Sequence, residues 1–229
     1  MKKTKKILAL ALAAVMLVSA TVAVTVAYLT STDSVTNTFA VGKVKITLDE
    51  LPVDPYGVPS TSEVVNGKTV WTPIPTEDLE DFEDRVKANT YKLIPGHTYV
   101  KDPTVHVQAN SEECYVFIKV ANGIEDIVVA GEEDGTIEAQ ILVNWDVVDA
   151  DEGIYVYKDT VPTSATVTNL VVFESFTVAD DAVLTNAAGN PLYSAETPVT
   201  VQAYAIQADG FDIAVDADLA AMLTALGLN

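Results

Sequence analysis

Apolar and polar residues alternate with a period of two in several stretches of the chain. In the first stretch, residues 41–48, Val44, Ile46 and Leu48 alternate with polar or small residues. This spacing is typical of a β-strand with one buried face. The same pattern predicts strands at 104–109, 114–120, 137–148, 153–158, 165–178 and 199–208. Because turn-forming residues separate these runs and no βαβ rhythm is present, we expect an all-β fold, a β-sandwich or a jelly roll, with short peripheral helices.

The strands predicted at 104–109 and 114–120 flank a polar turn at 110–113. We expect these two strands to form a hairpin or to face one another. Asp102-Pro103 directly precedes the first of them. Since proline is tolerated mainly in edge strands, the strand that follows is expected at a sheet edge.

Two segments have helical patterns. Residues 75–83 place acidic side chains in the first turn after Thr76, which favours a helix N-terminus. Residues 216–226 place Leu219, Met222 and further leucines on one face. This amphipathic pattern predicts a helix that packs on the edge of the domain.

The N-terminal residues have the order of a secretory signal. Four lysines lie within residues 2–6, an apolar stretch follows at 7–18, and small residues continue to Ala27. This order predicts export, with cleavage after Ala27 and Tyr28 as the new N-terminus. The alternative is an uncleaved membrane anchor, because an apolar span of about 20 residues is long enough to cross a bilayer.

Cleavage after Ala27 divides the chain into a signal peptide, residues 1–27, and residues 28–229, which we expect to form a single domain. Residues 51–76 hold five of the ten prolines and little periodicity, so they are expected to be an exposed insertion. Cleavage removes four lysines and no acid, so the formal charge changes from −20 to −24. Such a charge argues against nucleic acid as a partner, because phosphate binding needs clusters of Lys and Arg.

The sequence contains no motif of a known catalytic or metal site. His97 and His106 are the only histidines, and neither His-Glu-x-x-His nor Gly-x-Ser-x-Gly occurs. Cys114 is the single cysteine and lies in a predicted strand, where a buried, inert thiol is expected. The acidic stretches 132–135 and 149–153 would offer oxygen ligands to calcium, or are simply solvated turns. We therefore expect that the protein is not an enzyme and binds no cofactor. Whether it binds calcium stays open.

Two parts of the chain resemble a known family. Residues 27–42, Ala-Tyr-Leu-Thr-Ser-Thr-Asp-Ser-Val-Thr-Asn-Thr-Phe-Ala-Val-Gly, are similar to the region after the signal in proteins processed by the SipW-type signal peptidase. Residues 95–103, with Tyr115-Val116-Phe117 on the following strand, are similar to an internal segment of the same proteins. The chain thus resembles the TasA and camelysin (CalY) family of biofilm-matrix proteins, over residues 1–48 and 94–120.

The resemblance implies a jelly-roll domain, export to the cell surface or extracellular matrix, a signal peptidase as a transient partner, and self-association into fibres. In that family the N-terminal segment of one subunit can complete the sheet of its neighbour, and residues 28–48 correspond to this segment. Val35, Asn37, Phe39 and Val41 alternate with small residues within it, so they are the expected assembly contacts, with Phe39 and Val41 as anchors. The protease activity attributed to camelysin is not implied, because the chain lacks a metal-binding signature.

Three alternatives stay open at this point. In the first, residues 28–48 form an ordinary first strand of their own domain and do not pair with a neighbour. The protein would be a monomeric surface adhesin or binding module for a glycan or host protein, with aromatic contacts at Trp71, Trp145, Tyr155 and Tyr157. It would be a secreted protease. In each reading that includes cleavage, the membrane is a partner only through the signal segment before it is removed.

Overall fold

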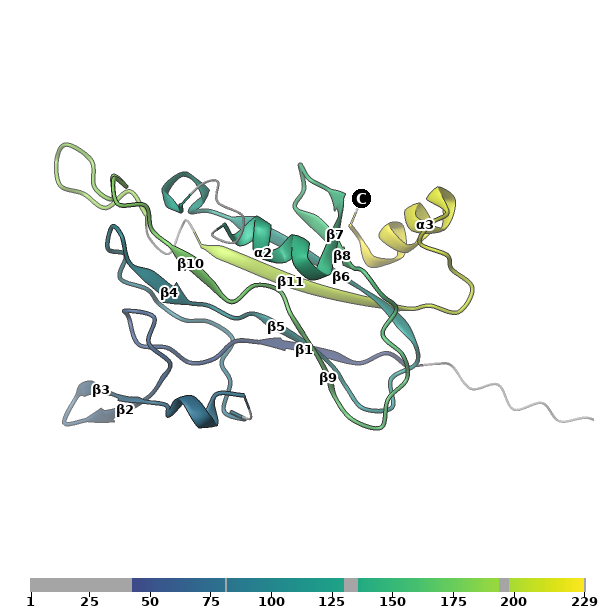
Figure 1. The fold of residues 1–229 in the computed structure, drawn as a ribbon, viewed down its shortest axis with the longest axis horizontal. Coiled ribbons are helices and arrows are strands. Elements are labelled where there is room, and N and C mark those ends of the chain that lie inside the picture. The colour runs from purple at the N-terminus through teal and green to yellow at the C-terminus, as the bar shows by residue number, and fades with distance from the viewer. Residues whose placement is uncertain (1–42, 81, 130–135, 194–197, 229) are drawn as a thin grey trace, which may run out of the picture. The chain divides into compact units, whose positions relative to one another are not determined.

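The computed structural model describes residues 43–80, 82–129, 136–193 and 198–228, and these residues form mainly antiparallel β-strands (Figure 1). The strands are β1 (Ile46–Asp49), β2 (Ser60–Val65), β3 (Lys68–Pro73), β4 (Thr98–Val100), β5 (Thr104–Val107), β6 (Cys114–Asn122), β7 (Trp145–Asp149), β8 (Ile154–Tyr157), β9 (Thr168–Val171), β10 (Ser175–Thr177) and β11 (Val199–Gln207). The helices are the 3-10 turns η1 (Thr76–Asp78) and η2 (Glu125–Ile127) and the α-helices α2 (Ile137–Asn144) and α3 (Asp216–Leu226). The expectation of an all-β protein with short helices is confirmed.

Two sheets form the body of residues 43–228. One has the strand order β1-β5-β9 and the other β11-β6-β8-β7. A two-stranded ladder of β4 and β10 continues the first sheet in the same register, because Thr104 pairs with Val171, and four residues away Val100 pairs with Ser175. The run predicted as one strand at 165–178 is therefore two strands in line, β9 and β10, with a short break between them.

The main core lies between these two sheets. Val105 and Val107 of β5 are buried in one cluster with Val116 and Ile118 of β6. Because β5 and β6 belong to different sheets, they face one another across the core. Of the two arrangements expected for these strands, facing strands are correct and the hairpin is wrong.

Strand β6 is buried on its other face as well. Tyr115 and Phe117 alternate with the core residues and join Ile154 of β8 and Met222 of α3 in a second cluster. Helix α3 has the predicted bounds and packs its apolar face on this side of the sheet (Figure 1). No helix in the described ranges is long and apolar enough to span a membrane.

Residues 137–148 do not form the single strand predicted for them. The Thr136 hydroxyl accepts a hydrogen bond of 3.0 Å from the amide of Ala139, which caps helix α2 at its N-terminus. Ile137 and Ile141, four residues apart, are both buried in the main core. The strand β7 begins only at Trp145. An apolar run of this length is compatible with the period of a strand and with that of a helix. The cap by Thr136 and the burial of two side chains four residues apart favour the helix.

Two further expectations are wrong. Strand β5 is central rather than at an edge, since β1 pairs on one side of it and β9 on the other. Pro103 is tolerated because it precedes the first strand residue, and its carbonyl accepts a bond of 2.9 Å from the amide of Val172. The helix predicted at 75–83 is only the 3-10 turn η1, whose N-cap residue Pro75 makes no side-chain capping bond.

The proline-rich stretch 51–76 contains a separate hairpin of β2 and β3. Asn66 and Gly67 connect the strands with φ angles of 52° and 75°, as a type I′ turn requires. Apart from Ser60, every residue of the two strands is exposed. Leu51 and Val53 precede the hairpin and are buried, so this end of the stretch is part of the body.

Candidate functional site

All residues that the sequence singles out for processing and assembly lie outside the described residues. These are Ala27 and Tyr28 at the cleavage site and Val35, Asn37, Phe39 and Val41 in the assembly segment. The end of that segment, residues 46–48, is described and pairs with β5 of the same chain, so this part is an ordinary strand of its own domain. The acidic stretch 132–135 also lies outside the described residues. The structure does describe the surfaces of residues 43–228 that an added strand would meet, and among these one sheet edge is distinct.

Strand β11 is the edge strand of the second sheet and pairs only with β6 among the described strands. Two bonds extend this ladder beyond β11, from the amide of Ala208 to the carbonyl of Glu113 (2.8 Å) and from the amide of Gly123 to the carbonyl of Pro198 (3.2 Å). In an antiparallel ladder bonding residues alternate, so even-numbered residues of β11 bond to β6. The backbone groups of residues 199, 201, 203, 205 and 207 therefore point outward, and no described residue bonds to them.

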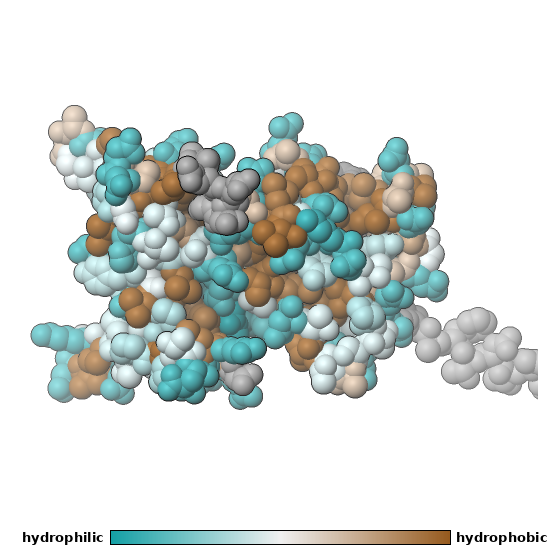
Figure 2. All heavy atoms as spheres, viewed as in Figure 1, coloured by the Kyte–Doolittle hydropathy of each residue, from teal (hydrophilic) through white to brown (hydrophobic). Residues whose placement is uncertain are grey.

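The composition of β11 is unusual for an exposed edge. Its nine residues, Val-Thr-Val-Gln-Ala-Tyr-Ala-Ile-Gln, include no charged residue and no proline. The side chains of Val199, Val201, Ala203 and Ala205 pack against the main core but remain partly exposed. Figures 1 and 2 show the same face of the molecule, and β11 runs across it in Figure 1. In Figure 2 this face has apolar patches between the polar ones. Proteins usually protect an edge with charge, proline or a bulge, and none of these protects β11.

The opposite edge of the body, along β9 and β10, is covered. The indole Nε1 of Trp145 donates to the carbonyl of Val171 (3.2 Å), and the amide of Val129 donates to the carbonyl of Thr177 (2.9 Å). Between these bonds the Gln140 side chain replaces a strand: its Oε1 accepts from the amide of Ser175 (3.2 Å) and its Nε2 donates to the carbonyl of the same residue (2.8 Å). This edge offers little to an added strand.

The two remaining edges are short or partly occupied. On β1, Lys87 Nζ donates to the carbonyl of Leu48, and Glu50 and Val86 exchange two backbone bonds of 2.9 and 2.8 Å. Strand β7 has five residues, of which Asp146 and Asp149 are acidic, and carries a bulge. Charge and bulges are features that discourage pairing. Among the described residues, β11 is therefore the longest strand edge without a backbone hydrogen-bond partner.

A cavity of about 550 Å³ opens at the N-terminal end of β11. Val199, the first residue of the strand, lines it together with the aromatic side chains of Tyr91, Phe176 and Tyr193. Lys92 and Lys101 are the charged residues that line it, and no carboxylate does so among the described residues. In a chain with 33 acidic residues, the described wall of this cavity is thus mainly apolar and free of carboxylates.

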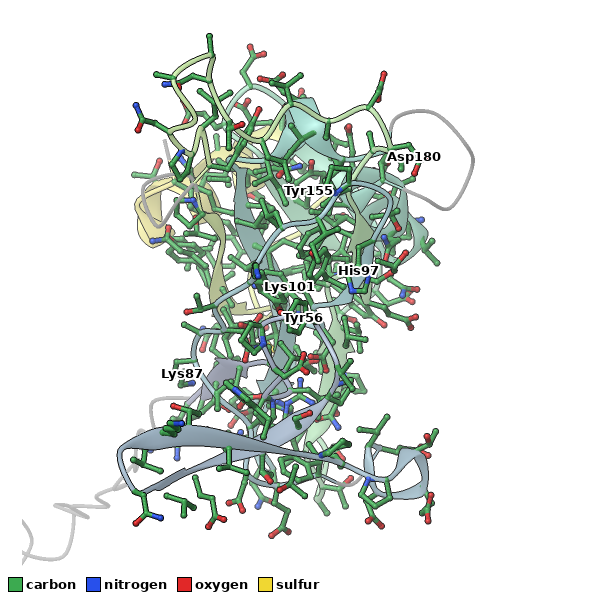
Figure 3. All side chains as sticks on the ribbon, turned by 90° about the vertical axis from the view of Figure 1, so that its left-hand side faces the viewer. Tyr56, Lys87, His97, Lys101, Tyr155 and Asp180 are labelled. Carbon is green, nitrogen blue, oxygen red and sulfur yellow. The ribbon has the colours of Figure 1, made fainter. Side chains whose placement is uncertain are left out.

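The floor of the cavity consists of closely packed aromatic rings and a buried ion pair. Tyr91 packs edge-on against Tyr99 and Phe176, with ring centroids 5.7 and 5.4 Å apart. The ammonium of Lys101 is buried and lies 2.6 Å from the Glu50 carboxylate, so its charge is already paired. Burial, with the nearby Glu50 carboxylate, raises the pKa of Tyr91, which therefore stays neutral. Figure 3 views this end of the molecule, with Lys101 near the centre and His97 and Tyr56 beside it.

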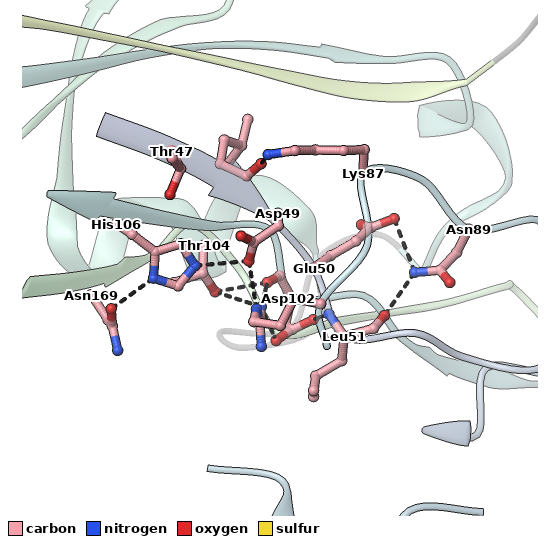
Figure 4. A network of polar contacts seen from close by, with 12 residues as sticks. Thr47, Asp49, Glu50, Leu51, Lys87, Asn89, Asp102, Thr104, His106 and Asn169 are labelled. Carbon is pink, nitrogen blue, oxygen red and sulfur yellow. Dashed lines mark hydrogen bonds and ion pairs between the residues drawn. The ribbon is translucent and has the colours of Figure 1, made fainter. Parts of the chain in front are cut away.

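A second polar feature is a cluster of ion pairs beside β1 and β5 (Figure 4). Arg85, the single arginine, lies 2.6 Å from Asp49 Oδ1 and 2.7 Å from Asp102 Oδ2, and donates to the hydroxyl of Thr104 (3.1 Å). Burial alone would lower the pKa of Arg85, but its bonds to the two carboxylates raise it overall. Burial raises the pKa of Asp102, against the effect of the Arg85 bond and of a bond from the amide of Leu51.

The cluster holds chain segments together. Its members come from β1, from the segment around Arg85 and from β5, which are distant in the sequence. His106 has Nε2 2.7 Å from Asp49 Oδ1 and Nδ1 2.7 Å from Asn169 Oδ1, so neither ring nitrogen contacts a hydroxyl or thiol. A nucleophile and its base must be within hydrogen-bond reach, and His106 has no such neighbour among the described residues. The geometry therefore supports a structural role for the cluster.

The remaining candidate residues are placed as follows. Trp145 and Tyr155 are buried, with exposed fractions of 0% and 8%, and Tyr157 is partly buried, while Trp71 on the β2–β3 hairpin is 38% exposed. The turn at 149–153 is held by its own bonds, since Asp149 Oδ1 accepts from the amide of Glu152 and the Glu152 carboxylate pairs with Lys119 at 2.6 Å. Within the described ranges no group of three His, Cys, Asp or Glu residues is placed to hold a metal ion.

Cys114 lies fully buried in β6, as expected. Burial, with a smaller effect of Glu113, raises the pKa of its thiol from 9.0 to about 11. Because the folded-state pKa is the higher one, its contribution to stability is complete below pH 9 and is lost as the pH rises to about 11. The thiol is therefore a poor nucleophile at neutral pH.

We expect the free energy of unfolding of the wild type to fall by about 2 kcal/mol more than that of Cys114→Val between pH 8.5 and 11. The reason is that the unfolded thiol ionises in this range and the buried thiol does not. Urea unfolding of both proteins at several pH values measures this difference. The comparison removes the contribution of the buried tyrosines, which both proteins share. Equal pH slopes would contradict the burial of an un-ionised thiol.

The open edge and the cavity were not found from the sequence. The period-two pattern at 199–208 predicts the strand β11. The absence of charged residues from this strand is the one signal in the sequence that would have indicated an edge able to pair with an added strand. The cavity joins residues from 89 to 199, and no local pattern indicates that they meet. Comparison with known proteins adds no assignment, since no family model, no curated protein and no solved structure matches this chain.

Proposed function

We propose that this chain is an exported structural protein of the cell surface or extracellular matrix, whose subunits assemble into fibres by strand addition. Residues 28–41 of the assembly segment 28–48, freed by cleavage after Ala27, pair with a sheet of a neighbouring subunit, while residues 46–48 stay in β1 of their own subunit. The sandwich is of jelly-roll type in this proposal, and the protein is not an enzyme. The resemblance of residues 1–48 and 94–120 to the TasA and camelysin family motivates the proposal.

The observation that carries this proposal is the free edge of β11. Five outward-facing residues of this strand leave their amides and carbonyls without a described partner. An added strand would satisfy these groups, and main-chain hydrogen bonds of this kind supply the affinity in strand addition. Such an edge is a risk of uncontrolled association in a protein that works as a monomer.

Charge also favours assembly through this segment. Residues 28–42 contain a single charged residue, Asp33, and β11 contains none. Two copies of the cleaved chain, each with a formal charge of −24, repel one another over most of their surface. Contact between the nearly neutral segment of one copy and the neutral edge of another avoids most of this repulsion.

Deletion of residues 28–40 from the secreted protein, with the signal peptide kept, tests the proposal. We expect the intact secreted protein to begin at Tyr28 and to form fibres in electron micrographs, and the shortened protein to stay monomeric in sedimentation. N-terminal sequencing verifies the cleavage site in both. Polymer formed equally well by both proteins would exclude strand addition, and isolated particles of the intact protein would favour a monomeric binding module.

A further inference from the structure

The cavity at the start of β11 lies at the end of the body opposite to Lys43. Three contacts establish this. Lys101 lines the cavity and pairs with Glu50, which directly follows β1. At the other end of the body, the amide of Glu112 donates to the carbonyl of Lys43 (3.1 Å), and the neighbouring Glu113 accepts from the amide of Ala208, directly after β11. Strands β1 and β11 therefore run in opposite directions, and the cavity is far from the first described residue.

This separation decides which chain can fill the cavity with a given residue. Phe39 is four residues before Lys43, so an extended chain carries it at most about 14 Å from that residue. The nine residues of β11 span about 27 Å between their two ends. Phe39 of a subunit therefore cannot reach the cavity of the same subunit, whereas Phe39 of a second copy can.

We propose that the cavity at the start of β11 binds Phe39 of a second copy of this chain, with the preceding residues of that copy antiparallel to β11. This inference rests on the proposed function and adds the accepting site, the direction of the added strand and the polarity of the fibre. The direction follows from length. If Phe39 lies beside Val199, only an antiparallel strand has enough residues to follow the rest of β11, and residues 31–39 match its nine positions.

The chemistry of the cavity suits a phenylalanine side chain. Aromatic walls from Tyr91, Phe176 and Tyr193 allow edge-to-face contacts with an added ring. Phe39 is the only phenylalanine between residues 28 and 42, and its segment carries little charge. Residues that pair directly across a ladder share a face, so Asn37 and Val35 would face the partly exposed Val201 and Ala203.

The polarity of the assembly follows from the two ends. The chain enters the described body at Lys43, and the cavity lies at the other end of that body. The interface is thus head-to-tail, and each added copy presents a new free segment or a new free cavity. Interfaces of this kind build open filaments unless the rotation closes a ring.

Paired substitutions test this inference. Phe39→Asp removes the side chain that binds, and Leu184→Asp places a charge in the cavity, which Leu184 lines. Leu192→Asp is the matched control, because Leu192 is in the same loop, is 47% exposed and does not line the cavity. Thr185→Asp is a second cavity variant at an exposed residue, in case Leu184→Asp unfolds. Thermal unfolding of each variant verifies its fold.

We expect Phe39→Asp and either folded cavity variant to raise the critical concentration for assembly at least about tenfold, and the control to leave it unchanged. Mixed one to one, the Phe39→Asp and cavity variants should stop at dimers in size-exclusion chromatography, because only one joint can form between them. If deletion of 28–40 abolishes assembly but the cavity variants assemble normally, the cavity is not the site and strand addition still stands. If the deletion itself has no effect, both proposals fail.

Discussion

Replacing Arg85 by methionine is expected to lower the free energy of unfolding by about 3–5 kcal/mol at pH 7. The guanidinium is mostly buried and bonds to the carboxylates of Asp49 and Asp102. Its removal leaves two carboxylates whose remaining partners among the described residues are His106 and the amide of Leu51, and an uncompensated buried charge is costly. Urea unfolding followed by circular dichroism measures the change.

Two comparisons sharpen this prediction. The exposed ion pair of Lys119 with Glu152 is the matched control, and Lys119→Met should change stability little, because exposed pairs contribute little. The loss in Arg85→Met should be smaller at pH 4 than at pH 7, since protonation neutralises the orphaned carboxylates. In the wild type as well, burial raises the pKa of Asp102. The contribution of this carboxyl to the free energy of unfolding is therefore larger at low pH and is lost as the pH rises. A pH-independent loss would show that the side chain acts through packing and not through charge.

Truncating Trp145 to alanine is expected to cost about 3–5 kcal/mol of stability. The indole is fully buried, packs edge-on against Tyr157 with centroids 5.3 Å apart, and covers the carbonyl of Val171 at the β9 edge. The substitution leaves a large cavity in the main core and an unpaired carbonyl. Trp145→Phe keeps much of the packing and should cost less.

Trp71→Ala is the matched control for this prediction. Trp71 is 38% exposed on the β2–β3 hairpin, so its loss should change the free energy of unfolding by less than about 0.5 kcal/mol. The pair also bears on the adhesin alternative, in which both residues contact a ligand. If Trp145→Ala left the free energy of unfolding unchanged, the burial of Trp145 in the core would be contradicted. Trp145 would then again be a candidate for contact with a ligand.

The failed expectations about individual elements have a common cause. At 137–148 the alternation fits a strand, yet Ile137 and Ile141 are buried on one side of a helix because the adjacent core accepts that face. Pro103 indicates an edge only if it lies within the ladder, and here it lies one residue before it. In both cases a neighbour in space decides, and the local pattern is compatible with either outcome.

The sequence by itself determined the β-rich class, most strand positions and the helix at 216–226, because period-two and helical burial patterns are local. It also predicted that the single cysteine, Cys114, is buried, and it contains no catalytic motif. Only the tertiary structure decided which strands are central, which edges are covered, and which distant residues line the cavity at β11. These properties depend on which distant segments meet, as when Gln140 covers the β10 edge. Pairing of distant segments follows from the packing of the whole core, and no local spacing specifies it.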